Sequence, residues 1–384
     1  MAQPSAVIVG AGLGGLTAAL ALHRVGWHVQ VVERAPSLEP VGAAISLWPN
    51  ALRALDAIGV GAGVRAHARL TGAGGVRRPD GRWLARSDIT SAVLHRYGEP
   101  LVMLRRSELV ALLVDALPPG TVETGTTVTG LASPDGPVTL RTDRGDLGAD
   151  LVVAADGIRS TLRAALFPDH PRPRYVGYQA WRMIVPAVDD TTGAFETWGR
   201  GGARFAVVPM DADFWYCYAT LVLPAGQADP DPAAELVARF GTWHAPIPEV
   251  LARIKPGSLL RQDVEELGTA LPTMHAGRVA FVGDAAHAMT PDLGQGGCMA
   301  IEDAVVLGST LRDAPVPEAL IRFTSSRLPR TTTVATRSRR TSRLYEAPYP
   351  VQILAARLMA LLPDAVAVRG LDSIVGWRPP SPTR

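Results

Sequence analysis

The stretch AVIVGAGLGGLTAALALHRVGWHVQVVE (residues 6–33) decides the fold. It predicts an apolar buried strand, a glycine-rich turn, a helix with apolar spacing and a second strand that ends in Glu33. Gly10, Gly12 and Gly15 satisfy the GxGxxG pattern at a turn where a side chain would keep a pyrophosphate from the N–H groups of the helix N-terminus. Glu33 follows Gly12 by about 20 residues, the spacing that places an acid on a ribose hydroxyl. The unit predicts dinucleotide binding without separating NAD from FAD, and the alternative is a tight turn that serves packing alone.

Composition removes several classes of function. The 384 residues carry a net charge of only +2, which indicates neither a nucleic-acid nor a membrane partner. Lys255 is the only lysine, so the chain has no Walker P-loop and little room for Schiff-base chemistry. Two cysteines cannot form a disulfide framework or a cysteine-rich metal site, and we expect no metal. The N-terminus lacks a signal peptide and no apolar run reaches membrane-spanning length, so we expect a cytoplasmic protein.

A second glycine-rich loop occurs far along the chain, in GDAAHAMTPDLGQGGCMAIEDAVVLG (283–308). One ligand with two ends explains both loops, and FAD is such a ligand, with ADP at one end and a ribityl chain and redox-active ring at the other. Asp284 follows a predicted strand and can accept hydrogen bonds from ribityl hydroxyls. Three glycines would let the backbone approach the ring: Gly294, Gly296 and Gly297. The positive end of the helix that follows would stabilise the charge of reduced flavin.

The middle of the chain predicts further elements. A small-residue loop leads into a helix over 41–60, and an amphipathic helix covers 105–117 with Ser107 as its N-cap. Strands are predicted at 128–131 and 138–142, and a third ends in AADGIRSTLR (154–163). Aromatic and β-branched residues concentrate between 174 and 225, which predicts an antiparallel sheet. We expect most of these aromatic side chains in its core and a few along a flat pocket.

Three ordered motifs carry a family resemblance: GAGLGG, AADGIRSTLR and GDAAHAMTPDLGQGG. With them the chain resembles the class A flavin-dependent monooxygenases, the p-hydroxybenzoate hydroxylase type, over residues 5–345. The resemblance implies an α/β fold, with a Rossmann-like FAD-binding domain, an inserted antiparallel-sheet substrate domain and C-terminal helices. The implied ranges are 1–70, 100–170 and 272–330 for the discontinuous FAD-binding domain, 71–99 and 171–271 for the substrate domain, and 331–384 for C-terminal helices and a disordered tail.

The resemblance also implies the cofactors. These are FAD and, as reductant, NADH or NADPH, for which the family has no separate binding fold. The residues expected to bind FAD are Gly10, Gly12, Leu13, Gly14, Gly15, Glu33, Arg34, Ser46, Arg106, Val128, Asp156, Gly157, Asp284, Pro291, Gly294, Gly296 and Gly297.

Within the family, VGAAISLWPN and the spacing of Arg204 and Tyr216 are similar to FAD-dependent urate hydroxylases. That similarity implies that Arg204 and Tyr216 hold the substrate, and that Asp292 of TPD supports the arginine near the flavin. YQAWR differs from the matching urate-hydroxylase segment and, with Arg182, is similar to salicylate-hydroxylase-like relatives, which leaves the substrate open. In the alternative, Arg204 only pairs with Asp292 and Tyr216 belongs to the core. His287 is a candidate general base. It follows Asp284 in a motif that the cofactor alone explains, so a structural role is the better interpretation.

The function expected is an FAD-dependent monooxygenase. NAD(P)H would reduce the flavin, and a flavin C4a-hydroperoxide would place one oxygen of O2 on a small planar aromatic or heterocyclic substrate. One alternative is a flavin-dependent reductase or desaturase on the same scaffold. Another is a non-catalytic flavoprotein that sequesters an aromatic ligand. The sequence does not indicate the choice between NADH and NADPH or the oligomeric state.

Overall fold

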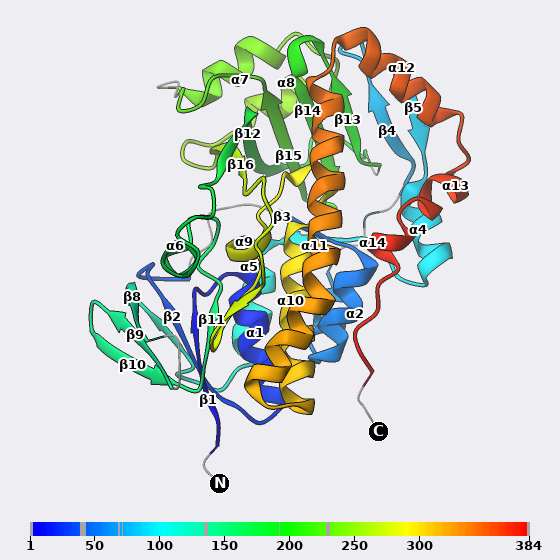
Figure 1. The fold of residues 1–384 in the computed structure, drawn as a ribbon. Coiled ribbons are helices and arrows are strands. Elements are labelled where there is room, and N and C mark those ends of the chain that lie inside the picture. Colours follow the sequence, from blue (N-terminus) through cyan, green and yellow to red (C-terminus); the bar gives the residue numbers. More distant parts are fainter. Residues whose placement is uncertain are drawn as a thin grey trace.

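Two sheets divide the molecule. The computed structural model describes residues 3–38, 44–67, 70, 72–133, 137–191, 193–227 and 231–381. A six-stranded sheet has the order β17-β18-β11-β1-β2-β7, and a seven-stranded sheet has the order β16-β12-β15-β14-β13-β4-β5. Figure 1 shows the six-stranded sheet in the lower half of the molecule and the seven-stranded sheet in the upper half. The predicted α/β class with a Rossmann-like sheet, an antiparallel sheet and C-terminal helices is confirmed.

The N-terminal strand–helix–strand unit forms as predicted. β1 (Ser5–Val9) and β2 (His28–Glu33) are parallel neighbours joined by α1 (Leu13–Arg24). On its other side β1 pairs with β11 (Leu151–Ala154), which pairs in turn with β18 (Val279–Phe281), all parallel. The outer strands are β7 (Val122–Thr124) and β17 (His275–Ala276). Because the carboxyl ends of parallel strands meet at one edge, the three glycine motifs that follow β1, β11 and β18 are brought together there.

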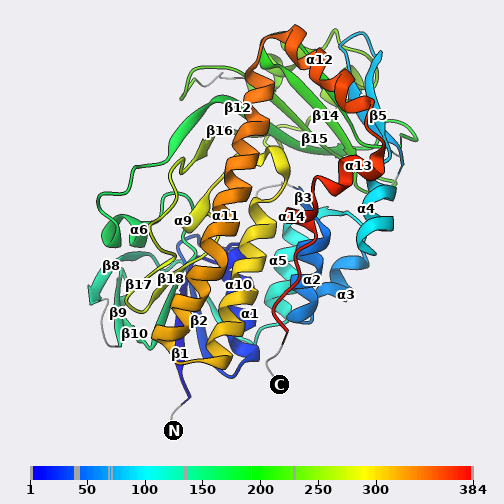
Figure 2. The ribbon, with the colours of Figure 1, turned by 45° about the vertical axis from the view of Figure 1, so that its right-hand side comes forward.

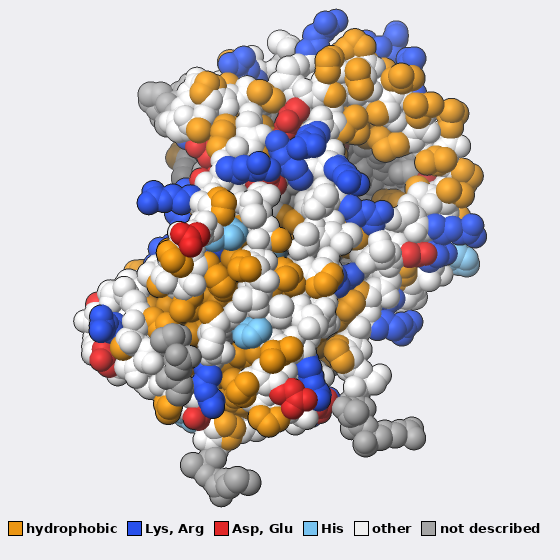
Figure 3. All heavy atoms as spheres, in the orientation of Figure 1, with side chains coloured by type: hydrophobic (Ala, Val, Ile, Leu, Met, Phe, Trp, Pro, Cys, Tyr) orange, Lys and Arg blue, Asp and Glu red, His pale blue; other side chains and the backbone are white. Residues whose placement is uncertain are grey.

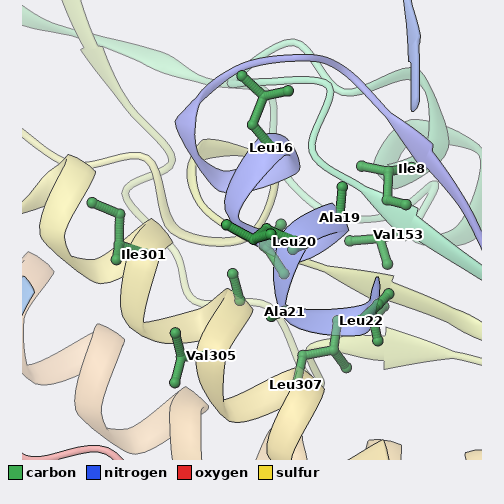
Figure 4. Packing of buried hydrophobic residues seen from close by; sticks show 14 of the residues in the cluster. Ile8, Leu16, Ala19, Leu20, Ala21, Leu22, Val153, Ile301, Val305 and Leu307 are labelled. Carbon is green, nitrogen blue, oxygen red and sulfur yellow. The ribbon is translucent and has the colours of Figure 1, made fainter. Parts of the chain in front are cut away.

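The helices that follow two of these motifs pack against each other. α1 lies along α10 (Gly296–Asp313), and Figure 4 shows Leu20 and Ala21 of α1 beside α10. The contact is close because small residues face each other: a Cβ added to Gly308 would lie 3.0 Å from that of Ala21. The helix N-termini are neighbours too, since a Cβ on Gly14 would lie 3.4 Å from that of Ala300. Both helices therefore present their N–H ends to the same region.

Two predictions in the middle of the chain are wrong in detail. The segment 41–60 contains β3 (Ala44–Leu47) before α2 (Pro49–Ala57), where only a loop was expected, and residues 41–43 lie outside the described residues. β3 pairs with the distant β6 (Val102–Arg105), a partner that local sequence cannot reveal. Ser107 is not an N-cap, because α5 (Arg106–Asp115) begins one residue earlier. The remaining elements of this part are α3 (Gly61–Arg65), α4 (Ile89–Tyr97), β8 (Val128–Ser133), β9 (Val138–Thr142), β10 (Gly145–Ala149) and α6 (Thr161–Leu166).

The seven-stranded sheet has two faces of opposite character. Its strands are β4 (Gly74–Arg77), β5 (Trp83–Ser87), β12 (Arg174–Pro186), β13 (Phe195–Trp198), β14 (Arg204–Pro209), β15 (Phe214–Leu221) and β16 (Leu260–Glu266). Trp181, Phe205 and Trp215 point into a core that includes α7 (Pro232–Phe240) and α8 (Ile247–Ala252). Because side chains alternate along a strand, their polar neighbours lie on the opposite face, toward the six-stranded sheet.

The C-terminal helices connect the two halves. α11 (Val316–Glu346) packs on α10 and reaches the seven-stranded sheet, as Figures 1 and 2 show. It is followed by α12 (Tyr349–Ala360), α13 (Asp364–Arg369) and α14 (Asp372–Val375). Figure 3 shows hydrophobic side chains gathered at the surface over α12. Within the described residues no helix combines the length and apolar character needed to cross a membrane. The predicted disordered tail falls partly on 382–384, outside the described residues.

Candidate active site

A cavity of about 1090 Å³ separates the carboxyl edge of the six-stranded sheet from the polar face of the seven-stranded sheet. Eleven of the residues predicted to bind FAD line it: Gly12, Leu13, Gly14, Ser46, Arg106, Gly157, Asp284, Pro291, Gly294, Gly296 and Gly297. Arg182, Arg204 and Tyr216 of the seven-stranded sheet line its other side, and Asp292 lines it from the second glycine loop. The cavity thus brings together residues from nearly the whole chain.

The first glycine turn has the geometry of a phosphate-binding loop. Gly10 adopts a φ of 103°, and a Cβ on it would lie 2.5 Å from the carbonyl oxygen of Ala155. A Cβ on Gly15 would lie 1.9 Å from the carbonyl oxygen of Gly10, so the close turn requires glycine at both positions. Gly12 instead faces the cavity, where a Cβ would lie 3.8 Å from Nη2 of Arg106. The N-terminus of α1 and a guanidinium therefore face one space, which fits a pyrophosphate.

Two carboxylates beside this turn retain hydrogen-bonding capacity. Glu33 accepts from the backbone N–H of Ala11 at 2.8 Å and of Ala35 at 2.9 Å, which leaves lone pairs on both of its oxygens. Asp156 accepts from the N–H of Thr161 at 2.8 Å through Oδ2, while its buried Oδ1 has no partner among the described residues. Burial raises the pKa of Asp156. Both carboxylates fit the hydroxyl groups of a bound nucleotide.

The second glycine loop leaves room for a planar ring. Gly294 has a left-handed φ of 61°, and a Cβ on Gly296 would project into open space. Gly297 is required for packing instead, since its Cβ would lie 2.8 Å from Cδ1 of Ile45. Asp284 is exposed in the first turn of α9 (Asp284–His287), next to the loop. This cradle, together with the first turn, fits FAD.

Six residues predicted to bind FAD do not line the cavity. Gly10 and Gly15 shape the first turn. Glu33 accepts a hydrogen bond from Ala11 of that turn, and Asp156 accepts one from Thr161 in its own loop after β11. Arg34 is exposed, and the partly buried Val128 belongs to β8. The structure does not bring these last two side chains into the cavity wall.

Arg204 is held by residues from both halves of the molecule. Its Nη2 donates to Oδ1 of Asp292 at 3.0 Å, Nη1 to Oε1 of Glu196 at 3.3 Å, and Nε to Oγ1 of Thr220 at 2.9 Å. The guanidinium carbon lies 3.7 Å from the ring centroid of Tyr345. Burial alone would lower the pKa of Arg204, but the two carboxylates outweigh it and raise that pKa, so the arginine stays charged.

Several of these partners carry no sequence motif. Tyr178 donates to Oδ2 of Asp292 at 2.7 Å, and Ser342 on α11 donates to the same oxygen. Tyr218 donates to Oε1 of Glu196 at 3.1 Å, and Trp198 to Oε2 at 2.6 Å. Sequence analysis missed these residues because only the pairing of β12 to β15 and the position of α11 bring them to Arg204.

Tyr216 lies on the same polar face as Arg204 but is displaced from it along the strands. The register pairs Arg204 with Thr220 and Val208 with Tyr216, so Arg204 and Tyr216 are on adjacent strands without being opposite each other. Tyr216 is a neighbour of Arg182 on β12 instead, and both side chains line the cavity. Burial raises the pKa of Tyr216, against the opposing charge of Arg182, so its hydroxyl keeps its proton.

His287 does not line the cavity. Its Nε2 lies 2.5 Å from Oδ2 of Asp303, which also accepts from the N–H of Gly283 at 3.0 Å. The ion pair of Asp303 with the fully buried Arg327 completes a network beneath the second glycine loop. This position agrees with the structural role expected for the histidine.

Comparisons with known proteins agree with this geometry. A family model described as an FAD binding domain matches residues 4–338. The chain is 37% identical over 329 residues to the aurachin C monooxygenase/isomerase of Stigmatella aurantiaca. This match covers 84% of this chain and 85% of that protein. It is 32% identical over 352 residues to the FAD-dependent urate hydroxylase of Klebsiella pneumoniae, covering 87% and 88%. The crystal structure of Klebsiella pneumoniae HpxO complexed with FAD and uric acid matches with a TM-score of 0.90 at 27% identity, over 97% of this chain and 96% of that one.

The fold and the glycine-lined cavity define a flavoprotein of the oxidoreductase class. The chain belongs to the FAD-binding family of class A flavin monooxygenases, as its motifs predicted. FAD as cofactor is likewise confirmed.

Proposed function

We propose that this chain uses FAD, NADH or NADPH, and O2 to place one oxygen atom on a small planar aromatic or heterocyclic substrate. One observation carries the proposal: the cavity has a dinucleotide cradle on one side and a polar sheet face on the other. The ion pair of Arg204 with Asp292 joins the two sides. A substrate in the remaining space would lie between the flavin loop and the sheet.

Bound FAD supplies the redox chemistry, and the chain supplies binding, orientation and electrostatics. Gly12 and Arg106 would hold the pyrophosphate, and Asp284 the ribityl hydroxyls. The N-terminus of α10, next to Gly296, would stabilise negative charge on the ring. The polar sheet face would cover the ring, exclude water and hold the substrate edge-on. Asp292 would keep the loop at a constant distance from that sheet face.

We also propose the two-domain division expected from the sequence. The six-stranded sheet would belong to the FAD-binding domain (1–70, 100–170 and 272–330), and the seven-stranded sheet to the substrate domain (71–99 and 171–271). The strand composition of each sheet supports this division. We infer that the protein acts in the cytoplasm, because its two cysteines are free and buried.

Cofactor content is the first test. Purified protein should be yellow and should release FAD, not FMN, on denaturation. A colourless protein that FAD cannot reconstitute would reject the proposal.

Oxygen labelling is the second test. A monooxygenase should consume O2 with NAD(P)H and place one ¹⁸O atom from ¹⁸O2 in its product. A reductase or desaturase would place none there, and a reductase would turn over anaerobically. A sequestering protein would bind the compound without faster NAD(P)H oxidation. A screen of aromatic and heterocyclic compounds for stimulated NAD(P)H oxidation supplies the substrate for this experiment.

A further inference from the structure

The cavity wall carries arginines with very different partners. Five arginines line it: Arg106, Arg159, Arg182, Arg204 and Arg261. Arg159 forms an ion pair with Glu265 at 2.8 Å, and Arg261 with Asp263 at 3.9 Å. Arg204 has two carboxylates. Among the described residues, Arg106 and Arg182 have no carboxylate partner. Arg106 faces the first glycine turn, so Arg182 is the unpaired cation on the side of the sheet.

The positive charge of Arg204 is already compensated by the carboxylates of Glu196 and Asp292. All three of its nitrogens donate to protein oxygens, one face stacks on Tyr345, and its side chain is 5% exposed. An anionic substrate oxygen at this point would also meet the negative charges of Glu196 and Asp292, which repel it. Arg204 therefore suits a structural connection better than substrate exchange.

Arg182 has the opposite character. It lies on β12 opposite Tyr218 and diagonal to Tyr216, on the face that lines the cavity. Its Nη1 donates to Oε1 of Gln262, a neutral group that leaves the positive charge uncompensated. The hydroxyl of Tyr216, which keeps its proton, is a second donor beside it. An anionic oxygen at this point would receive a charge-assisted bond from the guanidinium and a bond from the phenol.

We propose that Arg182 and Tyr216 together bind an anionic oxygen of the substrate, and that Arg204 is a positioning residue. The substrate class is a planar ring that carries an acidic oxygen: a carboxylate, a phenolate or an enolate. Apolar side chains that line the same cavity, including Leu101, Met103 and Val208, suit the ring itself. The inference rests on the proposed function, because it assigns the substrate side of the same cavity. It reverses the expectation that Arg204 is the arginine in contact with substrate.

The test measures binding to oxidised, FAD-loaded protein, with no nicotinamide nucleotide and no turnover. The probes are acids with nearly isosteric neutral partners: salicylate with salicylamide, and 3-amino-4-hydroxybenzoate with its primary amide. Binding is followed by the change in flavin absorbance. We expect the unmodified protein to bind at least one acid about 10- to 100-fold more tightly than its amide. Arg182→Gln should bring that ratio close to one, and Arg182→Lys should retain part of it.

The matched control is Arg204→Gln, which removes the same charge from the same cavity wall. We expect it to keep the acid-to-amide ratio, whatever happens to the absolute affinities. Tyr216→Phe should lower the affinity for the acid more than for the amide, because a hydrogen bond to a charged oxygen is stronger than one to a neutral carbonyl. FAD absorbance before each titration verifies that every variant is loaded.

Two results would overturn the inference. One is an unmodified protein that shows no preference for either acid over its amide. The other is a preference that survives Arg182→Gln but disappears in Arg204→Gln. Failure of the proposed function would look different: the acid preference and its dependence on Arg182 would hold, while the product of turnover would contain no ¹⁸O.

Discussion

Nη2 of Arg204 and Oδ1 of Asp292 lie 3.0 Å apart, and this contact joins the two sheets of the molecule across the candidate active site. Arg204 begins β14 of the seven-stranded sheet, whereas Asp292 belongs to the loop that follows the six-stranded sheet. The other oxygen of Asp292 accepts from Tyr178 and from Ser342 on α11. One carboxylate thus ties the loop to β12, β14 and the long C-terminal helix.

Arg204→Gln tests whether this connection sets the position of the loop. The change keeps part of the hydrogen bonding but removes the positive charge between the carboxylates of Glu196 and Asp292. We expect FAD to remain bound and flavin reduction to persist. Oxygenation should fall about 10- to 1000-fold, equivalent to roughly 1.4–4 kcal/mol. H2O2 formed per NAD(P)H should rise, because a displaced loop orients the substrate poorly. Arg204→Lys keeps the charge and should form less H2O2 per NAD(P)H than Arg204→Gln does. The same ratio of H2O2 to NAD(P)H in the unmodified protein and in both variants would contradict the prediction.

Gly15→Ala tests the packing of the first turn. The added Cβ would lie 1.9 Å from the carbonyl oxygen of Gly10, so the strand and helix must separate. We expect a loss of about 1–3 kcal/mol in the free energy of unfolding, and weaker FAD binding. Gly148→Ala is the control, because a Cβ there meets no atom within 4 Å. Urea unfolding and FAD titration measure both variants; equal losses would show that crowding is not the cause.

Arg327→Met tests the ion network beneath the second glycine loop. Arg327 donates to Glu302 at 2.6 Å and to Asp303 at 2.7 Å, and all three side chains are fully buried. Removing the cation leaves the two buried carboxylates without the charge of Arg327. We therefore expect the free energy of unfolding to fall by about 3–5 kcal/mol. On the same helix, Arg322→Met removes an exposed pair with Glu318 and should cost about 0–1 kcal/mol. A loss at Arg327 no larger than that at Arg322 would reject the prediction.

The same network predicts how stability depends on pH. Burial opposes the charge of Asp303, but His287 and Arg327 outweigh it and lower its pKa. A lowered folded-state pKa contributes stability that is complete above the unfolded value of about 3.9 and is lost as the pH falls through the folded value. The difference in unfolding free energy between the unmodified protein and Asp303→Asn should therefore be constant above about pH 5 and shrink in more acidic buffer. Urea unfolding across that range measures it; a difference that grows with acid has the wrong sign.

Local sequence predicted the elements whose pattern is self-contained. Residues 6–33 combine an apolar strand, three glycines and a helix in one continuous stretch, and all of these elements form. The aromatic segment also formed its antiparallel sheet, because alternation along each strand already separates the two faces. β3 was missed since its four residues are stabilised by pairing with β6, far away in the chain.

The candidate site was predictable only in part. Glycine motifs are visible because glycine is required by the backbone itself, at Gly10 and Gly15 for example. Glu196, Tyr178 and Tyr345 carry no such signal, since an acid or a tyrosine in a strand or helix fits many environments. Their contacts with Arg204 depend on strand register and on the path of α11.

The sequence by itself determined the cofactor cradle, because parallel strands followed by glycine turns can meet at only one edge of a sheet. It also determined which side chains share the polar face of the second sheet, because they alternate along each strand. Only the tertiary structure decided which of the two arginines on this face is paired with carboxylates and which is not. Arg182 and Arg204 are chemically identical residues on one sheet face, and the difference between them is the presence of Glu196 and Asp292 around one and Gln262 beside the other. Those neighbours come from distant strands and a loop, so the charge available to a substrate is set by packing and not by local pattern.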